Sequence, residues 1–133
     1  MAQSLANIHV HLVYSTQNRQ MIISDTVREP LHAHSATDLK AHRCHPDLIN
    51  SVEDHIHLLF DLGRMVAVSK VVAEVKAASL QWIKTQGADY SQFSWQGGYG
   101  AFAVDASNIE AVLRIATCRD EVVYVLRSRQ PGI

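Results

Sequence analysis

Alternating hydrophobic and polar positions mark the predicted strands of this chain. Residues 8–15, IHVHLVYS, alternate around β-branched and aromatic side chains, which is typical of a strand. Residues 48–54 and 55–62, LINSVED and HIHLLFDL, predict two more strands joined by a short acidic turn at 53–54. Residues 93–104 predict a glycine-containing loop that leads into a last strand.

A helix is predicted between the first two strands. It begins near Ser24 or Asp25, which are residue types that cap helices, and it runs to about Arg43. Pro46 prevents its continuation, because proline cannot donate the backbone hydrogen bond that a helix needs. Pro30 fits this helix only if it lies in the first turn.

Two further helices are predicted from apolar residues at helical spacing. The first is capped by Ser69 and stopped by Gly87. Its apolar positions form one stripe that can be buried: Val71, Val72, Val75, Ala78, Trp82 and Ile83. The last helix is predicted from Ser107 or Asn108 through Ile115.

The predicted elements are arranged in the order β-α-β-β-α-β-α. This order predicts an α+β fold, a ferredoxin-like split β-α-β sandwich whose mainly antiparallel sheet has its helices on one face. With 133 residues, 47% of them hydrophobic, the chain has the length of one domain and enough apolar material for its own core. The sequence shows no repeat, low-complexity segment or linker, so we expect residues 1–133 to form one domain.

Charge and cysteine content narrow the function classes only slightly. The net charge is −1, whereas nucleic-acid-binding domains are usually basic, although eight histidines can add positive charge near neutral pH. Cys44 and Cys118 are too few for a disulfide framework. No run of about 18 apolar residues predicts a transmembrane helix, and the N-terminus lacks the pattern of a secretory signal. We therefore expect a reduced, cytoplasmic environment and no membrane partner.

His55 and His57 are the most distinctive residues of the predicted strands. Residues two apart share one face of a strand, so both imidazoles point the same way while Ile56 points to the opposite face. Two adjacent imidazoles can hold one divalent cation such as manganese or zinc. A polar exposed strand face carries the same pattern, so the triplet alone leaves both interpretations open. His9 and His11 form a second pair, which we expect to lie at the surface or to pack in the sheet.

Longer stretches of the chain resemble a known family. They are HVHLVYSTQNR at 9–19, LHAHSATDLKAHRCHP at 31–46, INSVEDHIHLLFDL at 49–62, VSKVVAEVKAASLQWIKTQG at 68–87 and FSWQGGYGAFAVDASNIEAV at 93–112. The His-hydrophobe-His strand, the helix ending in Trp-Ile-Lys and the Trp-Gln-x-Gly-Tyr-Gly-Ala-Phe loop resemble the HUH-type single-tyrosine transposases. These are the insertion-sequence 200/605 type and its relatives associated with repetitive extragenic palindromes. The resemblance covers about residues 5–116.

The resemblance implies a chemistry and a partner. Family members cleave and rejoin single-stranded DNA: a tyrosine attacks a phosphodiester to form a 5′-phosphotyrosine link, and a divalent metal, Mg²⁺ or Mn²⁺, polarises the phosphate. It implies that His55 and His57 bind this metal, together with a polar residue of the last helix. We expect Arg19, Lys84 and Trp95 to contact the DNA, although Arg19 alone is equally well a solvated loop charge. A homodimer that binds single-stranded or hairpin DNA is also implied.

The last helix departs from the family pattern at the nucleophile. Family members carry Tyr-x-x-x-Gln there, usually within Val-Arg-Arg-Tyr-Ile-Ala-x-Gln, whereas this chain reads VLRIATC at 112–118. Either Ile115 and Arg119 occupy the tyrosine and glutamine positions, or one residue is missing before Ile115 and Cys118 replaces the glutamine. The second alignment is preferred because Ile-Ala then matches.

Tyr124 is the only tyrosine left near the expected nucleophile, and it is therefore the candidate catalytic residue. Residues 119–133 loosely resemble the C-terminal helix of the family and the residues after that helix. On an unbroken helix, Tyr124 lies nine residues after Ile115, about 900° around the axis, and so faces the opposite side. A buried or surface tyrosine of the tail is the alternative interpretation.

Three functions compete on this sequence. The first is a transposase by descent, whose cleavage step is lost if the nucleophile is lost. The second is a protein that binds hairpin DNA without cleaving it. The third is a histidine-triad-like nucleotide hydrolase, but that motif needs a third histidine two positions after His57, where this chain has Leu59.

Overall fold

The computed structural model describes residues 8–63, 65–104 and 123–125, the last three by their backbone. Within these residues the strands are β1 His9–Ser15, β2 His45–Val52, β3 His55–Asp61, β4 Gly100–Val104 and β5 Val123–Val125. The α-helices are α1 Asp25–Ala41 and α2 Val68–Ile83. Two short 3-10 helices, η1 Gln17–Arg19 and η2 Ala88–Tyr90, lie in the connections.

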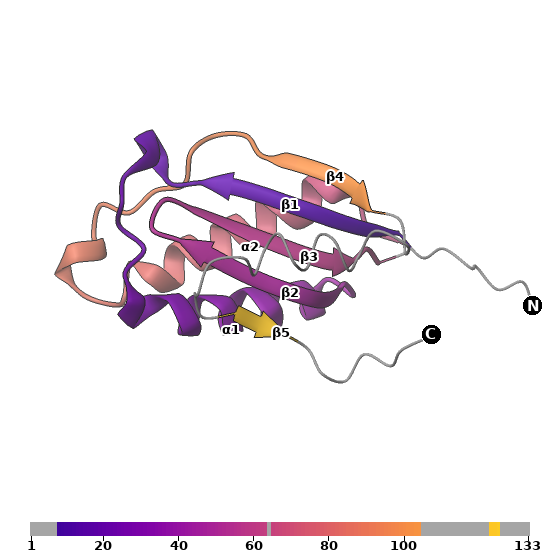
Figure 1. Ribbon diagram of the computed structural model, residues 1–133, viewed down its shortest axis with the longest axis horizontal. Coiled ribbons are helices and arrows are strands. Elements are labelled where there is room, and N and C mark those ends of the chain that lie inside the picture. The colour runs from indigo at the N-terminus through magenta and orange to yellow at the C-terminus, as the bar shows by residue number, and fades with distance from the viewer. Residues whose placement is uncertain (1–7, 64, 105–122, 126–133) are drawn as a thin grey trace, which may run out of the picture.

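The strands form one antiparallel sheet in the order β4-β1-β3-β2-β5 (Figure 1). β3 is the central strand and lies between β1 and β2. Helix α1 connects β1 to β2. α2 then connects β3 to β4, which pairs with the far edge of β1. This is the split β-α-β arrangement. The α+β, ferredoxin-like fold expected from the order of elements is confirmed.

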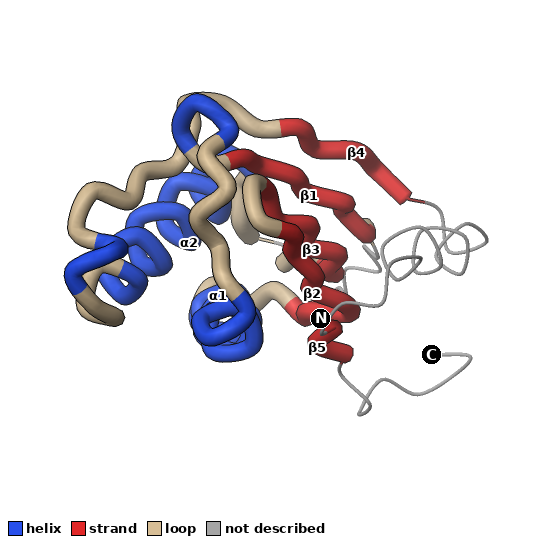
Figure 2. Tube along the Cα trace, turned by 60° about the vertical axis from the view of Figure 1, so that its left-hand side comes forward, coloured by secondary structure: helices blue, strands red, loops and turns tan. Residues whose placement is uncertain are grey.

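Both helices cover the same face of the sheet (Figure 2). Alternation along β3 directs Ile56, Leu58 and Phe60 into that interface, and each is 0% exposed. The helices contribute buried residues at helical spacing: Val27, Leu31 and Leu39 from α1 and Val71, Val72, Val75 and Ile83 from α2. The core therefore lies between the sheet and the helices. We call the opposite side of the sheet, which carries His11, His55 and His57, the histidine face.

Helix α1 begins where the sequence predicted and ends earlier. Ser24 is its N-cap, and its last residue is Ala41 rather than Arg43, because Arg43 has a left-handed φ of 62° that cannot continue a helix. Pro30 lies beyond the first turn, so the expectation that it fits only there is wrong. The missing proline N–H leaves the carbonyl of Thr26 without its helical donor, but Thr26 is exposed and water can replace that donor.

Strand β2 begins at His45, three residues earlier than predicted. The ladder between β2 and β3 is irregular between Pro46 and Leu48, where Asp47 is the extra residue of a β-bulge. A bulge is one of the places where a sheet accepts proline, which has no N–H for the ladder. Helix α2 likewise begins one residue before the predicted cap, with Ala67 rather than Ser69 as its N-cap.

The C-terminal region differs most from the sequence-based expectation. Residues 123–125 form strand β5 and pair antiparallel with residues 48–50 of β2, where the resemblance suggested a helix. The helix predicted from Ser107 or Asn108 through Ile115 lies outside the described residues. None of the helices that the structure describes is long and apolar enough to span a bilayer.

Candidate functional site

The two histidines of the predicted motif lie together on β3, on the face away from the helices. The antiparallel register places Ser15 of β1 opposite His55 and Val13 opposite His57. Both imidazoles are half-buried, and their ring centroids are 4.9 Å apart in an edge-on arrangement. The strand therefore presents two adjacent imidazoles on one face, as the alternating pattern predicted.

Asp54 fixes the orientation of His55. The Nδ1 atom of His55 donates to Asp54 Oδ1 at 2.7 Å, and Asp54 Oδ2 accepts from Arg19 Nε at 3.0 Å. Burial alone would raise the pKa of Asp54, but the hydrogen bonds from His55 and Arg19 outweigh it and lower that pKa. The ionised carboxylate holds the proton on Nδ1 of His55, which leaves a lone pair on Nε2.

Arg19 lies in the connection after β1, next to this carboxylate. Its side chain is 64% exposed, and its backbone has a left-handed φ of 55°. Only Nε is engaged, with Asp54; no hydrogen bond joins its terminal guanidinium nitrogens to another described residue. Two parallel N–H donors of this kind match the oxygens of a phosphate. The predicted phosphate contact is therefore available beside His55.

His11 contacts His57 directly, which the sequence reasoning missed. Their rings stack with centroids 5.1 Å apart, and a hydrogen bond of 2.9 Å joins His11 Nε2 and His57 Nδ1. With the proton on Nδ1, His57 donates this bond and keeps a lone pair on its own Nε2. The sequence contained a signal for this contact, the His9-x-His11 pair on the neighbouring strand. Only the register of β1 against β3 shows that His11 lies beside His57.

The environment of these histidines favours their neutral forms. Burial, together with the nearby His11 and His55, lowers the pKa of His57 to about 4. Burial also lowers the pKa of His11. A neutral imidazole is the form that can ligate a metal, so His57 needs no deprotonation near neutral pH.

The donor set of His55 and His57 fits a divalent metal that receives two imidazoles. Each has its Nδ1 in a hydrogen bond, the way metal-binding histidines are commonly oriented, and no described residue bonds to either Nε2. Within residues 8–63, 65–104 and 123–125, no group of three or more His, Cys, Asp or Glu side chains is arranged to hold a metal ion. We therefore assign His11 not as a third ligand but as the hydrogen-bond partner that orients His57. The segment at 112–118, from which the resemblance implies a further ligand, lies outside the described residues.

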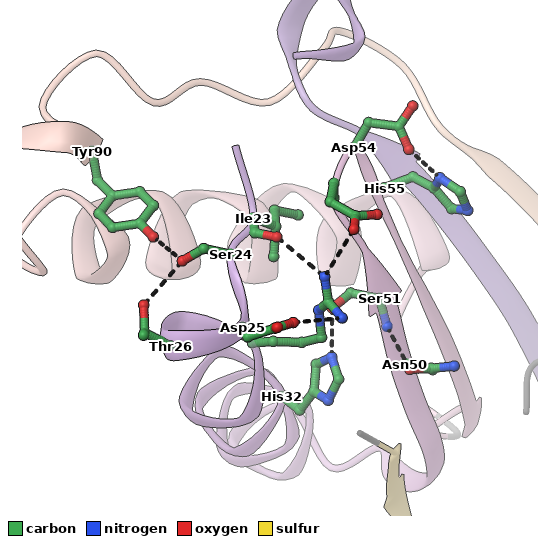
Figure 3. A network of polar contacts seen from close by, with 12 residues as sticks. Ile23, Ser24, Asp25, Thr26, His32, Asn50, Ser51, Asp54, His55 and Tyr90 are labelled. Atoms are coloured by element: carbon green, nitrogen blue, oxygen red, sulfur yellow. Dashed lines mark hydrogen bonds and ion pairs between the residues drawn. The ribbon is translucent and has the colours of Figure 1, made fainter. Parts of the chain in front are cut away.

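A network around the buried Arg28 ties the turn before His55 to helix α1 (Figure 3). Arg28, only 5% exposed, contacts Glu53 at 3.8 Å and Asp25 at 3.1 Å, in both cases between guanidinium nitrogen and carboxylate oxygen. The backbone of Ile23 accepts from Arg28 at 3.3 Å and donates to the Glu53 carbonyl at 2.9 Å. These bonds hold the turn from the helical side, so the start of β3 is fixed.

Two of the predicted DNA contacts lie away from the histidine face. Trp95 is 7% exposed; it packs edge-on against Tyr14 and Phe93, and its Nε1 donates to Ser79 Oγ at 3.0 Å. A buried indole has no exposed ring face for a base, so its role in the structure is to anchor its loop. Lys84 is exposed at the C-terminal end of α2, in the helical layer on the other side of the sheet (Figure 2).

The four tyrosines of the chain lie in different environments. Tyr14 and Tyr90 are 2% and 8% exposed, and burial raises the pKa of Tyr14, which disfavours a nucleophilic phenolate. Tyr99 is 45% exposed in the loop before β4. Tyr124 lies on strand β5, opposite Ile49, and not on the helix from which its position was first inferred. With β2 between β5 and β3, its backbone is about 10 Å from the histidine strand.

Comparison with known proteins gives the same family as the motifs. The family model described as "Transposase IS200 like" matches residues 4–115. A Deinococcus radiodurans R1 protein, assigned as a transposase and solved by crystallography, superposes with a TM-score of 0.70 at 15% identity. The match covers 86% of this chain and 95% of that one. A search of curated protein sequences finds no significant match.

A REP-associated tyrosine transposase solved with a REP hairpin superposes with a TM-score of 0.55 at 12% identity. That match covers 87% of this chain and 68% of the other. At such identities both neighbours support the fold alone, whereas the family model spans most of the chain and includes both histidines of β3. The chain belongs to the IS200-like transposase family.

Proposed function

We propose that this chain binds single-stranded DNA next to a hairpin, with a phosphate of the strand held on the histidine face by a divalent metal on His55 and His57. The observation that carries the proposal is the pair of Nδ1 hydrogen bonds, to Asp54 and His11, which leaves both Nε2 atoms for the metal. Family membership and a fold neighbour solved with a REP hairpin support DNA as the partner.

In this proposal each residue of the site has one role. His55 and His57 would hold Mg²⁺ or Mn²⁺, which when bound supplies a Lewis acid for a phosphate oxygen. Asp54 and His11 keep the two ligands in the tautomers that bind a metal. The terminal nitrogens of Arg19 donate to the phosphate and neutralise part of its charge.

We further propose that the chain retains recognition but lacks the covalent cleavage step. That step requires a tyrosine oxygen in line with the scissile phosphate. Tyr14 and Tyr90 are buried, and Tyr124 lies on an edge strand separated from β3 by β2. The sequence at 112–118 contains no tyrosine. An active transposase is the alternative, and it would have to use Tyr99 or Tyr124.

Metal binding is tested by calorimetry with Mn²⁺. We expect the wild-type chain to bind one Mn²⁺ per chain. His55→Ala and His57→Ala should each abolish the heat of Mn²⁺ binding and leave the circular-dichroism spectrum unchanged. His42→Ala removes a histidine at the end of α1 and serves as the matched control, which should bind as wild type. Unchanged Mn²⁺ binding by the double variant of His55 and His57 would show that the metal site is elsewhere.

Cleavage is tested with end-labelled hairpin DNA that carries a single-stranded extension, in the presence of Mn²⁺. We expect a shifted complex in native gels and no adduct in denaturing gels. Inserting a tyrosine between Arg114 and Ile115 should produce an adduct. An adduct from the unaltered chain, lost in Tyr99→Phe or Tyr124→Phe, would instead support the active transposase and identify its nucleophile.

We propose that the chain is a homodimer. β4 is an edge strand with exposed residues along most of its length, and such an edge has backbone groups that a second copy can pair with. Light scattering at increasing concentration should give the mass of two chains. A monomeric mass throughout would refute the dimer without affecting the metal site.

A further inference from the structure

A cavity of about 390 Å³ lies beside the histidine pair, between β1, the start of β4 and the loop that joins α2 to β4. Its lining includes Val13, Ser15, Gln96, Tyr99, Gly100 and Phe102. This volume is within the range of small-molecule sites, about 300–1,000 Å³. His55 and His57 do not line the cavity, so it is a space distinct from the proposed metal site.

The cavity borders the proposed metal site through the sheet register. Val13 lies opposite His57 and Ser15 opposite His55, so two lining residues are the cross-strand neighbours of the two ligands. Phe102 lies opposite His11, and the two rings are 6.3 Å apart. Cross-strand neighbours have Cβ atoms about 5 Å apart, so a phosphate at the histidines has the cavity next to it.

Two aromatic rings at the cavity are exposed to solvent. Phe102 is 59% exposed and Tyr99 45%, although both rings are large and apolar. Phe102 extends over Gly100, where an added Cβ would lie 3.2 Å from the phenyl ring. The phenyl ring thus lies in the space that a side chain at position 100 would occupy, and the glycine lets it pack there. Exposed aromatic rings beside a backbone-binding site are the platforms on which unpaired bases stack.

The wall of the cavity is held in place before any ligand arrives. The Nζ atom of Lys76 donates to the carbonyls of Gln96 at 2.8 Å and Gly98 at 3.1 Å. The backbone N–H of Gln96 donates to Ser15 at 2.8 Å, and its side-chain oxygen accepts from Asn18 at 3.0 Å. With Oε1 of Gln96 engaged, its amide NH₂ remains as a donor for the edge of a base. A preformed wall reduces the entropy cost of binding.

We propose that this cavity binds one unpaired nucleobase of the DNA strand, stacked on Phe102 and Tyr99, while the adjacent phosphate lies at His55 and His57. This inference rests on the proposed DNA-binding function and adds a base-binding subsite to it. The occupant is a base rather than an apolar peptide side chain, because the cavity adjoins a phosphate-type site formed by Arg19 and the histidine pair.

The test compares two ligands that differ only in their bases. One is a DNA hairpin with a single-stranded thymidine extension; the other is the same hairpin with an abasic extension of equal length. The wild-type chain should bind the thymidine ligand on the order of tenfold more tightly, since base–aromatic stacking contributes about 1–3 kcal/mol per base. Phe102→Ala should remove most of that difference and leave the affinity for the abasic ligand unchanged.

A second variant tests the same space without removing an aromatic ring. Gly100→Val adds side-chain atoms beneath Phe102 at a strand position that favours β-branched residues, and it should also abolish the preference for bases. Met65→Ala is the control, because Met65 is 91% exposed and does not line the cavity. Its ligand preference should equal that of wild type.

The possible results separate the two proposals. No binding of either ligand by the wild-type chain would overturn the DNA-binding function, and the subsite with it. Equal binding of both ligands would keep the DNA-binding function and overturn the subsite. Equal losses for both ligands in Phe102→Ala, or a change of that variant from dimer to monomer in light scattering, would assign the cavity to another role and also overturn the subsite.

Discussion

The two faces of strand β3 differ: one packs only apolar residues against the helices, and the other carries His55 and His57 beside the buried Leu59. Ile56, Leu58 and Phe60 are 0% exposed against the helices, whereas His55 and His57 alternate with them on the histidine face. On the helical side the strand is fixed by burial of apolar surface. On the histidine side, hydrogen bonds to Asp54 and His11 set the orientation of each ring.

The contrast also separates two kinds of histidine. His32 on α1 is 0% exposed on the core side, where its Nε2 is 2.7 Å from Ser51 Oγ. It completes a buried polar contact and has no path to a ligand. His57 is half-buried, and its second nitrogen has no described partner. Each histidine has one ring nitrogen without a hydrogen bond to a described residue, Nδ1 of His32 and Nε2 of His57. What distinguishes His57 is its partial exposure, which lets a ligand reach that nitrogen.

The largest expected effect comes from removing a core ring. Phe60→Ala should lower the free energy of unfolding by about 4 kcal/mol, because it deletes a fully buried side chain and leaves a cavity. Phe102→Ala makes the same chemical change on the histidine face, where the ring is 59% exposed, and should cost less than about 1 kcal/mol. Urea unfolding at pH 7 measures both. Similar losses in the two variants would mean that the histidine face is as tightly packed as the core.

This contrast was largely predictable from the sequence. Alternation along residues 55–62 placed the histidines and the apolar residues on opposite faces, and the order of elements gave the sheet. Two features of the fold were not predictable. The bulge at Asp47 depends on how Pro46 is accommodated against Phe60, and β5 depends on a pairing between residues far apart in the chain.

A smaller effect is expected from acid acting on the core histidine. Burial, followed by the charge of Arg28, lowers the pKa of His32 to about 4. The unfolded chain takes up this proton near pH 6.5, so His32 contributes its full stability above pH 6.5 and loses it as the pH falls toward 4. At pH 5 the loss should be about 2 kcal/mol.

The contribution of His32 is isolated by comparison with His32→Gln, which can still reach Ser51 but does not titrate. Urea unfolding at pH 7 and pH 5 should show a smaller pH dependence for the variant, by about 2 kcal/mol. A parallel pH dependence of the two proteins would show that His32 is not responsible. The remaining dependence in His32→Gln belongs to the other titrating groups.

The candidate site was less predictable than the fold. His55 and His57 were identified by a two-residue spacing, but the pairing of His11 with His57 requires the register of two strands that are separated by α1 and β2. Trp95 matched the family loop as a sequence position, yet its indole is directed into the core by Tyr14 and Phe93. A motif identifies the residue type, and only packing decides which side of the sheet the side chain reaches.

The smallest expected effect comes from substituting Asp54, and it tests most directly how the histidine face orients its metal ligands. Asp54→Ala removes the acceptor for Nδ1 of His55 without changing a proposed ligand. The Mn²⁺ affinity should fall roughly tenfold, the lower end for losing such a supporting carboxylate. Asp89→Ala is the control, since it makes the same change at an exposed residue of η2 that no hydrogen bond joins to the histidines, and it should bind Mn²⁺ as wild type does.

A positioning role for Asp54 predicts a spectroscopic change as well as a weaker site. Nitrogen chemical shifts of the imidazoles should place the proton of His55 on Nδ1 in the wild-type chain and shift it toward Nε2 in Asp54→Ala, because the Nδ1–H tautomer loses its carboxylate. A merely structural role would weaken binding without moving that proton. If the tautomer of His55 is the same in both proteins, Asp54 does not orient the ligand, and the contrast between a packed face and a hydrogen-bonded face loses its main support.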